Sequence, residues 1–292
     1  MSTVSGRTDS KAALPGAATR RSGPMLRWLG TRGPREFVLR WVVLFALFIG
    51  WELAAKAAES PYFPPPSEFA ARAAELWLPA DGTWLTEATA NDVLPSLARM
   101  FGGLALGSLV AVVLGVAIGL SRRLGDYVDP LIQFSRAIPP PALIPIFLVL
   151  FDRGALMRVL LIAFGAMWPV LLNTIEGVRS VDVIKYETAS IFRIGFADKL
   201  VRIVLPGAAQ KVFAGLRTSL ALGLILMVIS EMVASTGGIG FHIVQAQRSF
   251  QILDMWAGIL LLGVLGYLLN LVLTVVERRV LAWHRTTNRE IA

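Results

Sequence analysis

The sequence predicts an all-α integral membrane protein with six transmembrane helices. Its 292 residues are 55% hydrophobic and only 16% charged, whereas soluble domains contain about 25% charged residues. The mean hydropathy is +0.64. Met100–Ser121 and Met255–Val276 each run for 22 residues without a charged side chain. Such a run is long enough for a helix to cross a hydrocarbon core about 30 Å thick.

Four further segments have the apolar content of a span, although charges or prolines shorten some of them. The first has Arg40 and Glu52 near its two ends, where both side chains can reach the membrane interface. In chain order, the predicted spans are residues 37–55, 100–121, 131–151, 156–175, 212–234 and 255–276.

The distribution of basic residues predicts the orientation of these spans. Of the 28 Lys and Arg residues, 22 lie in the two tails and in the connections after the second and fourth spans, if Arg40, Arg136 and Arg217 at the span ends are counted with them. Lys and Arg are enriched in cytoplasmic loops, so both termini are predicted to be cytoplasmic.

These predicted spans divide the chain into three regions. Residues 1–35, rich in Ser, Gly, Pro and Arg, are expected to be a disordered basic tail that cannot bury enough surface to fold. The apolar run after this tail is too long for a cleavable signal peptide. Residues 36–280 form the membrane domain, with an acidic outer segment at 56–99 and a cytoplasmic loop at 176–211. Residues 281–292 form a second cytoplasmic tail.

Composition also excludes several function classes. The net charge of +8 lies in loops and tails that flank apolar spans, which argues against nucleic-acid binding. The chain has no Cys and only two His, so disulfides, Cys-ligated metals and thiol catalysis are excluded. Neither H-E-x-x-H nor G-x-S-x-G occurs, so the sequence predicts no metal site and no catalytic residues.

One charged segment, Tyr186–Pro206, stands between two apolar runs. It is interpreted as a helix, a turn at Gly195, a second helix and a stop at Pro206, because proline lacks an N–H and clashes with the preceding turn. The segment fits either an amphipathic helix on lipid headgroups or a helix that docks into a groove of a soluble partner. Its apolar positions at helical spacing are Ala189, Phe192, Phe196, Leu200 and Ile203.

Prolines and one carboxylate interrupt the apolar spans. Pro139, Pro140 and Pro141, followed by Pro145, cannot belong to one unbroken helix. Non-helical backbone at membrane depth is tolerated in a protein interior or beside a water-filled cavity. These prolines therefore either line a translocation path or form a packed kink. Glu231 is a second pathway candidate, although it could instead accept hydrogen bonds from the glycine-rich turn after it.

Glycines recur at four-residue spacing in the second span, as Gly103-x-x-x-Gly107 and Gly115-x-x-x-Gly119. Such pairs let helices approach closely. The sequence alone fits two interpretations, packing within the chain and packing between two copies.

The charged segment resembles the EAA loop of ATP-binding-cassette (ABC) importer permeases. That pattern is E-A-A, a Gly six residues after the last Ala, and then I-x-L-P. The chain departs from it once, with a Thr in the middle position. The residues that match, or stand at, the positions of this motif are Glu187, Thr188, Ala189, Gly195, Ile203, Leu205 and Pro206.

Other stretches resemble the subfamily that imports sulfonates, taurine and nitrate. They are SLARMFGGLALG at 96–107, RAIPPPALIPIFLVLF at 136–151 and ISEMVASTGGIGFHI at 229–243. One departure is FDRGALMR at 151–158, where the subfamily usually has a short glycine-containing turn. The departure weakens any inference about a particular substrate.

The resemblance implies the type I ABC importer fold and a non-catalytic permease subunit in a bacterial inner membrane. Two copies would form the pathway, with two ATP-binding subunits and a periplasmic or lipid-anchored binding protein that delivers a small anion. Glu187, Thr188 and Ala189 would lie in or beside a coupling helix, Gly195 would provide its turn, and Leu205 and Pro206 would close the loop. The chain would bind no cofactor, and the ATPase partner would use the ATP.

The alternative is a secondary transporter or channel without an ATPase. The absence of an internal repeat and of charge pairs for ion coupling in the sequence argues against it.

Overall fold

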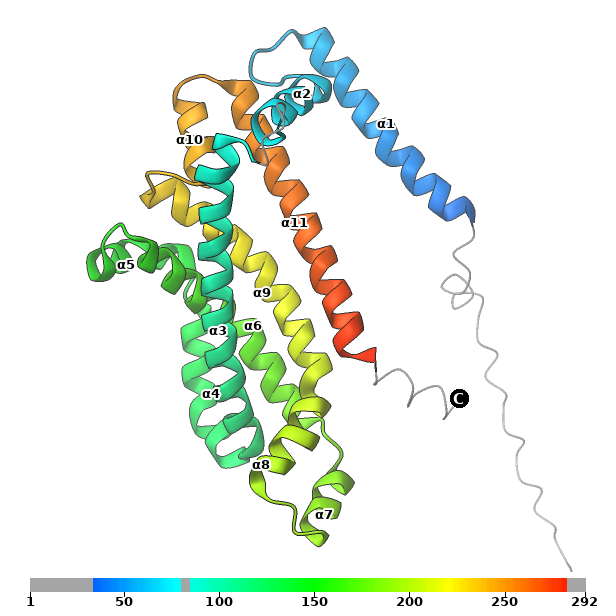
Figure 1. The fold of residues 1–292 in the computed structure, drawn as a ribbon, viewed down its shortest axis with the longest axis vertical. Helices are drawn as coiled ribbons and strands as arrows, with labels where there is room; N and C mark the ends of the chain where they lie inside the picture. Colours follow the sequence, from blue (N-terminus) through cyan, green and yellow to red (C-terminus); the bar gives the residue numbers. More distant parts are fainter. Residues whose placement is uncertain (1–33, 80–84, 283–292) are drawn as a thin grey trace, which may run out of the picture. The chain divides into compact units, whose positions relative to one another are not determined.

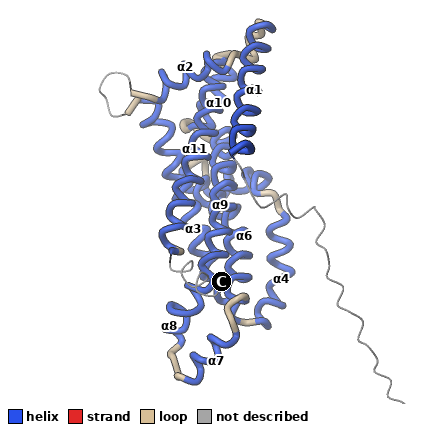
Figure 2. The backbone as a smooth tube through the Cα atoms, turned by 90° about the vertical axis from the view of Figure 1, so that its right-hand side faces the viewer, coloured by secondary structure: helices blue, strands red, loops and turns tan. Residues whose placement is uncertain are grey.

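The computed structural model describes residues 34–79 and 85–282, with side chains from residue 41 onward. Every regular element in this part of the chain is a helix, as Figure 1 and Figure 2 show. The described parts of residues 1–51 and of residues 52–292 belong to two units, each considered by itself. Most of the predicted tails, 1–35 and 281–292, lie outside the described residues.

The first span belongs to α1, Pro34–Ala58, whose part from Trp41 is apolar enough to cross a membrane. Its apolar side chains are exposed, Phe45 and Leu47 among them. This is the surface expected of a helix that contacts lipid, and it agrees with the span predicted at residues 37–55.

The second unit holds the other spans. Judged by length and apolar composition, the described residues contain five membrane-crossing helices, or up to six if one bent pair counts as a span. The elements are α2 (Pro66–Trp77), η2 (Thr89–Val93), α3 (Leu94–Leu120), α4 (Arg122–Ala137), η3 (Pro140–Leu143), α5 (Ile144–Phe151), α6 (Ala155–Arg179), α7 (Val183–Ile191), α8 (Phe196–Lys199), η4 (Leu200–Val204), α9 (Leu205–Ala234), α10 (Ile239–Arg248) and α11 (Ile252–Val280).

The core is built on α6, which packs against α3 on one side and α9 on the other (Figure 1). The glycines of α3 make the first contact possible. A Cβ at Gly103 would lie 2.7 Å from the backbone oxygen of Val159, and one at Gly107 would lie 2.5 Å from that of Ala163. Gly115, further along α3, lies similarly close to α6. Both glycine pairs therefore serve packing within the chain.

The third predicted span, residues 131–151, is not one helix. α4 ends at Ala137, and the next helical stretch, from Pro140 to Phe151, runs at 81° to it. Between them, Ile138 and Pro139 have extended backbone. The cause is the proline triplet, which removes consecutive N–H donors and forbids the helical turn before each ring.

The predicted helix stop at Pro206 is wrong. The helix that starts at Phe196 continues through this proline to Ala234, a stretch of 39 residues. The turn just before it is a π-helix, η4, in which Leu205 N–H bonds to the Leu200 carbonyl five residues back. This wider turn shifts the bonding register and accommodates a ring that has no N–H. The same arrangement, η2 before Pro95, opens α3.

The acidic outer segment at 56–99 contains the helix α2, which packs on α11. Arg72 Nε lies 2.6 Å from Asp254 Oδ1. This hydrogen-bonded pair, with a further one to Glu75, raises the pKa of Arg72, so the guanidinium stays charged. Trp256 adds an indole N–H bond of 3.1 Å to the Tyr62 carbonyl. Together these contacts fix the segment after α1 to the beginning of the last span.

Candidate functional site

The EAA-type residues lie in a short helical hairpin, the α7–α8 segment (residues 182–199), at one end of the bundle (Figure 1). Asp182 caps α7 by accepting a 2.9 Å hydrogen bond from Ile184 N–H. α7 ends in a tight turn where Ile194 N–H bonds to the Ala189 carbonyl at 2.9 Å. This turn positions the second helix, α8, which leads directly into α9.

The predicted coupling residues occupy different environments in this segment. Ala189 is 1% exposed, and a larger side chain would not fit there without displacement. Glu187 and Thr188 are exposed, and Glu187 forms no ion pair with the described residues. Leu205 and Pro206 are half-buried at the start of α9.

Gly195 lies in the turn between the two helices, as the residue that directly precedes α8, but the turn does not require a glycine there. Its φ is −59°, and a Cβ built on it meets no atom within 4 Å. The left-handed backbone position belongs to Arg193, with φ of 48°. The fold of this chain alone therefore places no steric demand for glycine at position 195.

Large apolar side chains on the segment are exposed. Ile191 is 77% exposed, Phe192 74% and Phe196 72%. The turn at 192–195 breaks the helical register, so Ala189 is buried while Phe192 and Phe196, expected on the same apolar stripe, are exposed. Exposed aromatic residues in a cluster indicate an interaction surface.

The rest of the hairpin is held against the bundle. Lys199 Nζ lies 4.8 Å from the centroid of the Tyr186 ring, within the range of a cation–π contact. The Tyr186 hydroxyl donates to the Val178 carbonyl at 3.4 Å, and burial raises its pKa. The segment therefore combines a fixed base with an exposed apolar tip.

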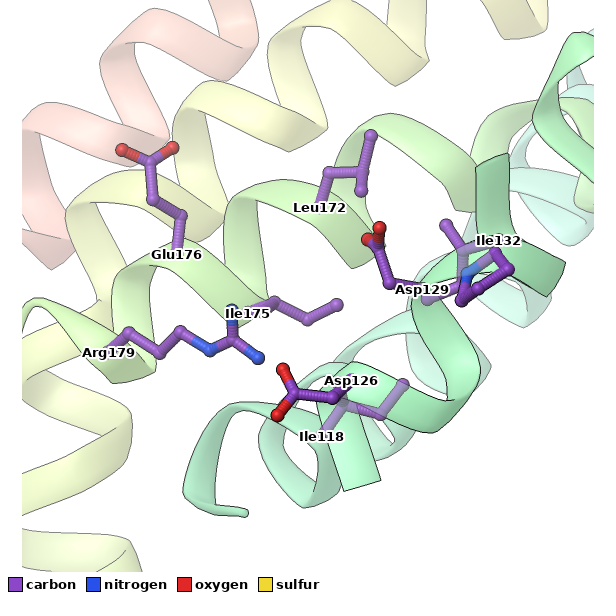
Figure 3. Close-up of a pocket in the computed structure, with 10 residues that line it drawn as sticks. Ile118, Asp126, Asp129, Ile132, Leu172, Ile175, Glu176 and Arg179 are labelled. Atoms are coloured by element: carbon purple, nitrogen blue, oxygen red, sulfur yellow. The ribbon is translucent and has the colours of Figure 1, made fainter. Parts of the chain in front are cut away.

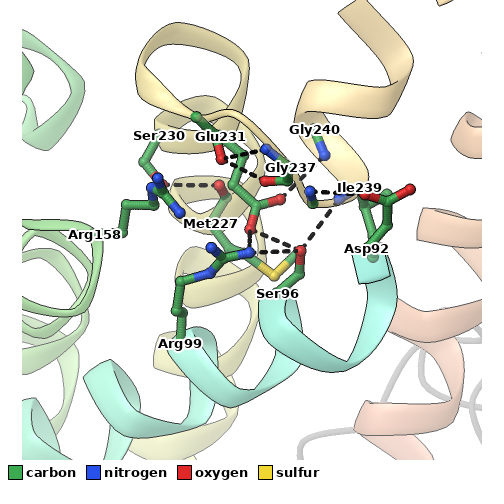
Figure 4. Close-up of polar contacts among 12 residues, drawn as sticks. Asp92, Ser96, Arg99, Arg158, Met227, Ser230, Glu231, Gly237, Ile239 and Gly240 are labelled. Atoms are coloured by element: carbon green, nitrogen blue, oxygen red, sulfur yellow. Dashed lines mark hydrogen bonds and ion pairs between the residues drawn. The ribbon is translucent and has the colours of Figure 1, made fainter. Parts of the chain in front are cut away.

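A second cluster of polar residues lies at the opposite end, around Glu231 on α9 (Figure 4). Glu231 is 1% exposed. Its carboxylate accepts hydrogen bonds from the Ser96 hydroxyl at 2.7 Å and from Arg99 Nη2 at 2.8 Å. It also accepts one from Gly240 N–H at 3.1 Å. Glu231 thus ties α3, α9 and α10 together.

The glycine-rich turn after α9 wraps this carboxylate. Gly238 has φ of 112°, a left-handed conformation that L side chains rarely adopt, and a Cβ there would lie 2.6 Å from the Glu231 carboxylate. At Gly240, a Cβ would lie 2.5 Å from the Val228 carbonyl oxygen. Asp92 Oδ1 accepts from Gly238 N–H at 2.9 Å and completes the turn.

Two arginines near this carboxylate, Arg99 and Arg158, were not predicted as part of a site. The sequence analysis counted them only among the basic residues that indicate membrane orientation. Arg158 is 5% exposed, and its Nη2 donates to the carbonyls of Arg153 and Ala234. The sequence did contain a signal for Arg158. An arginine close to the start of an apolar span needs hydrogen-bond acceptors from the protein.

The pathway candidates are thus separated in the structure. Glu231 is enclosed by its own partners, whereas the prolines lie at the break between α4 and α5. Pro140 and Pro141 line a cavity of about 690 Å³ between α4, α6 and α9. Pro139 and Pro145 are not among the residues that line it.

A second cavity, of about 540 Å³, lies on another face of α4, against α3 and α6 (Figure 3). Three carboxylates line it, those of Asp126, Asp129 and Glu176. Arg179 points toward Asp126, and its guanidinium occupies the space where Gly125 would carry a Cβ. The two cavities share Leu172 but differ in charge.

The fold and the EAA-type hairpin define a permease subunit of an ABC importer. The chain matches the family described as binding-protein-dependent transport system inner membrane component over residues 103–282. It belongs to that family.

Relatives support the same class. The chain is 31% identical over 191 residues to a Bacillus subtilis (strain 168) protein that bears the name of an aliphatic sulfonates transport permease, SsuC, covering 65% of this chain and 69% of that one. It is 30% identical over 240 residues to the taurine transport system permease protein TauC of Escherichia coli (strain K12), covering 82% and 86%. The nitrate import permease protein NrtB of Synechococcus elongatus is 28% identical over 242 residues, covering 80% and 84%.

The fold is also found in a solved structure. The MetNI methionine ABC transporter in an inward-facing conformation matches with a TM-score of 0.56 and 19% identity, covering 65% of this chain and 94% of that one. The expectation of an all-α, type I ABC importer permease of the sulfonate, taurine and nitrate type is therefore confirmed.

Proposed function

We propose that this chain is the membrane subunit of an ATP-driven importer that moves a small anion delivered by an external binding protein. The exposed apolar tip of the α7–α8 segment carries the proposal. Phe192 and Phe196 have no role in the chain's own core, and they stand among the residues that match the EAA pattern. A surface that the fold leaves exposed on a fixed base suits a docking partner.

The partner in this proposal is an ABC ATP-binding subunit, present in two copies beside two copies of this chain. The ATPase would bind and hydrolyse the ATP, and this chain would bind no cofactor. The membrane is a bacterial inner membrane with both tails in the cytoplasm, which places the α7–α8 segment on the ATPase side. The excess of Lys and Arg in the tails and in the connections after the second and fourth spans supports this orientation.

The structural environment of each proposed coupling residue suits its proposed role. Ala189 keeps the base of α7 close to the bundle, since only a small side chain fits at 1% exposure. Glu187 and Thr188 are free to contact the ATPase. Gly195 has open space around it, so its lack of a side chain serves the partner. Leu205 and Pro206 join the docking element to α9.

Transport would follow from movement of this element. When ATP closes the ATPase dimer, the α7–α8 segments of both copies would be drawn together, and the pathway between the copies would change its accessible side. Such coupling requires a stiff element with two discrete arrangements. The continuous helix from Phe196 to Ala234 meets that requirement.

The proposal is tested by purifying the full chain from membranes through a tag on this subunit. Wild type is expected to bring down a soluble ATPase in about equal ratio, and Gly195→Asp is expected to lose it. Thr236→Asp, an exposed position at the other end of the bundle, is the control for an added charge and should retain the ATPase. If the wild-type chain purifies alone and still moves anions in liposomes, it is a secondary carrier and the proposal is wrong.

A further inference from the structure

The turn between α5 and α6, residues 152–154, has a backbone that does not suit its sequence. Asp152 has φ of 56° and ψ of −175°, a conformation that glycine adopts readily and other residues adopt only at a cost. The glycine of the turn stands two positions later, at Gly154, where φ of −78° suits any residue. A Cβ built on Gly154 would meet its nearest atoms at 3.9 Å, an ordinary contact. The turn is therefore strained at Asp152, and its glycine does not relieve the strain.

The side chain of Asp152 offers no compensation for this strain. It is exposed, and its carboxylate forms no ion pair with the described residues. Strained backbone persists where the surrounding structure holds it in place, and such positions gather at sites that clamp or switch. The restraint on the turn therefore comes from the residues around it.

Arg158, in the first turn of α6, supplies that restraint. Its side chain is buried, and its Nη2 donates to the Arg153 carbonyl at 3.1 Å and to the Ala234 carbonyl at 3.4 Å. Ala234 is the last residue of α9, so a single nitrogen atom joins the α5–α6 turn to the end of α9. Figure 4 shows Arg158 reaching from α6 toward the part of α9 that carries Glu231.

The hydrogen bonding of Arg158 is incomplete. Its Nε is buried and has no hydrogen-bond partner among the described residues. A buried donor without an acceptor is uncommon in folded proteins and calls for an explanation. Both this donor and the strain at Asp152 raise the free energy of the described arrangement. They favour a second arrangement in which the turn has relaxed and the guanidinium has changed its acceptors.

We propose that the α5–α6 turn is a strained latch, which Arg158 fastens to the end of α9 and which is released in the transport cycle. In the proposed orientation this turn lies on the outer side of the membrane. When α9 moves with the α7–α8 segment, the bond between Arg158 and the Arg153 carbonyl would break and Asp152 would relax. The strain keeps the fastened and released arrangements close in free energy, so a small displacement of α9 switches between them. This inference rests on the proposed function and adds a switch at its outer side.

Two substitutions at one position separate the strain from the carboxylate. Asp152→Gly removes the carboxylate and relieves the strain, whereas Asp152→Ala removes the carboxylate and keeps the strain. Release of the latch is measured in right-side-out membrane vesicles that contain the full chain with its partners. Met157→Cys provides the signal, since Met157 is fully buried next to Arg158 in the chain and the sequence has no other Cys. Its rate of modification by an impermeant methanethiosulfonate reports how often this buried position opens.

Asp152→Gly is expected to slow the modification of Met157→Cys by about fivefold or more, because the strain that favours release is gone. Asp152→Ala should leave the rate unchanged, and so should Gly154→Ala, the matched control in the same turn. Leu156→Cys, which is 58% exposed one position earlier, should react equally fast in every variant. Equal rates for Asp152→Gly and Asp152→Ala would overturn the latch, because strain would then not govern release.

Arg158 is a positioning residue in this proposal, and a conservative variant tests that role. Arg158→Met removes both hydrogen bonds, so modification of Met157→Cys should become several-fold faster. Arg158→Lys retains a charged donor and should bring the rate back toward wild type. A rate for Arg158→Met equal to that of wild type would overturn the role of this side chain. If Arg158→Met does not accumulate in the membrane, the two Asp152 variants still decide the inference.

The link to the transport cycle is tested by trapping the ATPase with ATP and vanadate loaded inside the vesicles. Trapping should change the modification rate of Met157→Cys several-fold and leave that of Leu156→Cys unchanged. If the ATPase co-purifies with the chain but trapping has no effect, this inference alone is refuted. If no ATPase co-purifies, the proposed function is wrong, while the difference between Asp152→Gly and Asp152→Ala still shows whether the turn is a strained latch.

Discussion

The two ends of the helical bundle treat polar and apolar side chains in opposite ways. Around Glu231, polar groups are buried, and carboxylate, hydroxyl and backbone N–H groups satisfy one another. In the α7–α8 segment, apolar side chains such as Phe192 are exposed, and Glu187 has no ion pair among the described residues. The first end pairs its carboxylate within one chain, although the Nε atoms of Arg99 and Arg158 have no hydrogen-bond partner among the described residues. The second end is held on its base but leaves apolar side chains that no other described residue covers.

The largest expected effect on stability comes from disrupting the hydrogen-bonded cluster around Glu231. Glu231→Ala leaves Arg99, whose side chain is only 14% exposed, without its carboxylate and removes the acceptor for Gly240 N–H. Removing one member of a buried ion pair typically costs about 3–5 kcal/mol. Thermal unfolding of the detergent-purified chain should shift clearly downward. Glu231→Gln, which retains one acceptor oxygen, should lie between this variant and wild type. An unchanged midpoint for Glu231→Ala would refute the role assigned to this cluster.

The turn that encloses the carboxylate should respond next. Gly238→Ala forces an L side chain into φ of 112° and brings its Cβ within 2.6 Å of the Glu231 carboxylate. Strain of this kind costs about 1–3 kcal/mol. The expected result is a lower unfolding midpoint with the ATPase still bound at low temperature. Gly237→Ala, where a Cβ meets nothing within 4 Å, is the neighbouring control.

At the other end, a change should affect docking without affecting stability. Phe192→Ala removes a 74% exposed ring, so the unfolding midpoint of the chain alone should remain as in wild type. If the ring is an anchor for the ATPase, its loss should weaken the complex by about 2 kcal/mol, roughly thirtyfold. The yield of ATPase in the purification measures this. A lowered midpoint together with an unchanged yield would mean that the ring supports the chain's own fold.

The smallest effect is expected for Gly195→Ala. A methyl group there meets nothing within 4 Å, and the backbone φ of −59° suits any residue. The unfolding free energy should change by less than about 0.5 kcal/mol. This matched pair of glycines, at positions 195 and 238, sharpens the contrast between the ends. A large loss of stability at position 195 would show that the hairpin depends on this glycine for its own fold.

The membrane plan and the motif could be predicted from the sequence because both depend on local patterns. Charge-free runs identify spans, and the separation of Ala189, Gly195 and Pro206 is a fixed spacing. The continuity of the helix through Pro206 could not be predicted, since it depends on a π-turn that propensity rules do not contain. The exposure of Phe192 depends on where a turn breaks the register.

The cluster around Glu231 shows a second limit of prediction from the sequence. Its members come from segments far apart in the chain, with Ser96 and Arg99 more than 130 positions before Glu231. A single sequence holds no signal for such pairs. What it did show was the glycine-rich turn and the isolated carboxylate, and the structure joins the two because Gly238 and Gly240 leave room for that side chain.

The uninterrupted helix from Phe196 to Ala234 has a mechanical consequence. Its 39 residues correspond to about 58 Å at 1.5 Å per residue, so one rod joins the exposed hairpin to the Glu231 cluster. In the proposed mechanism, a displacement of α8 would pass along this helix to the Glu231 cluster, because the π-turn at residues 200–204 lies next to α8 and leaves the rest of the helix regular. The far end of that helix is held in place by the hydrogen bonds of the Glu231 carboxylate.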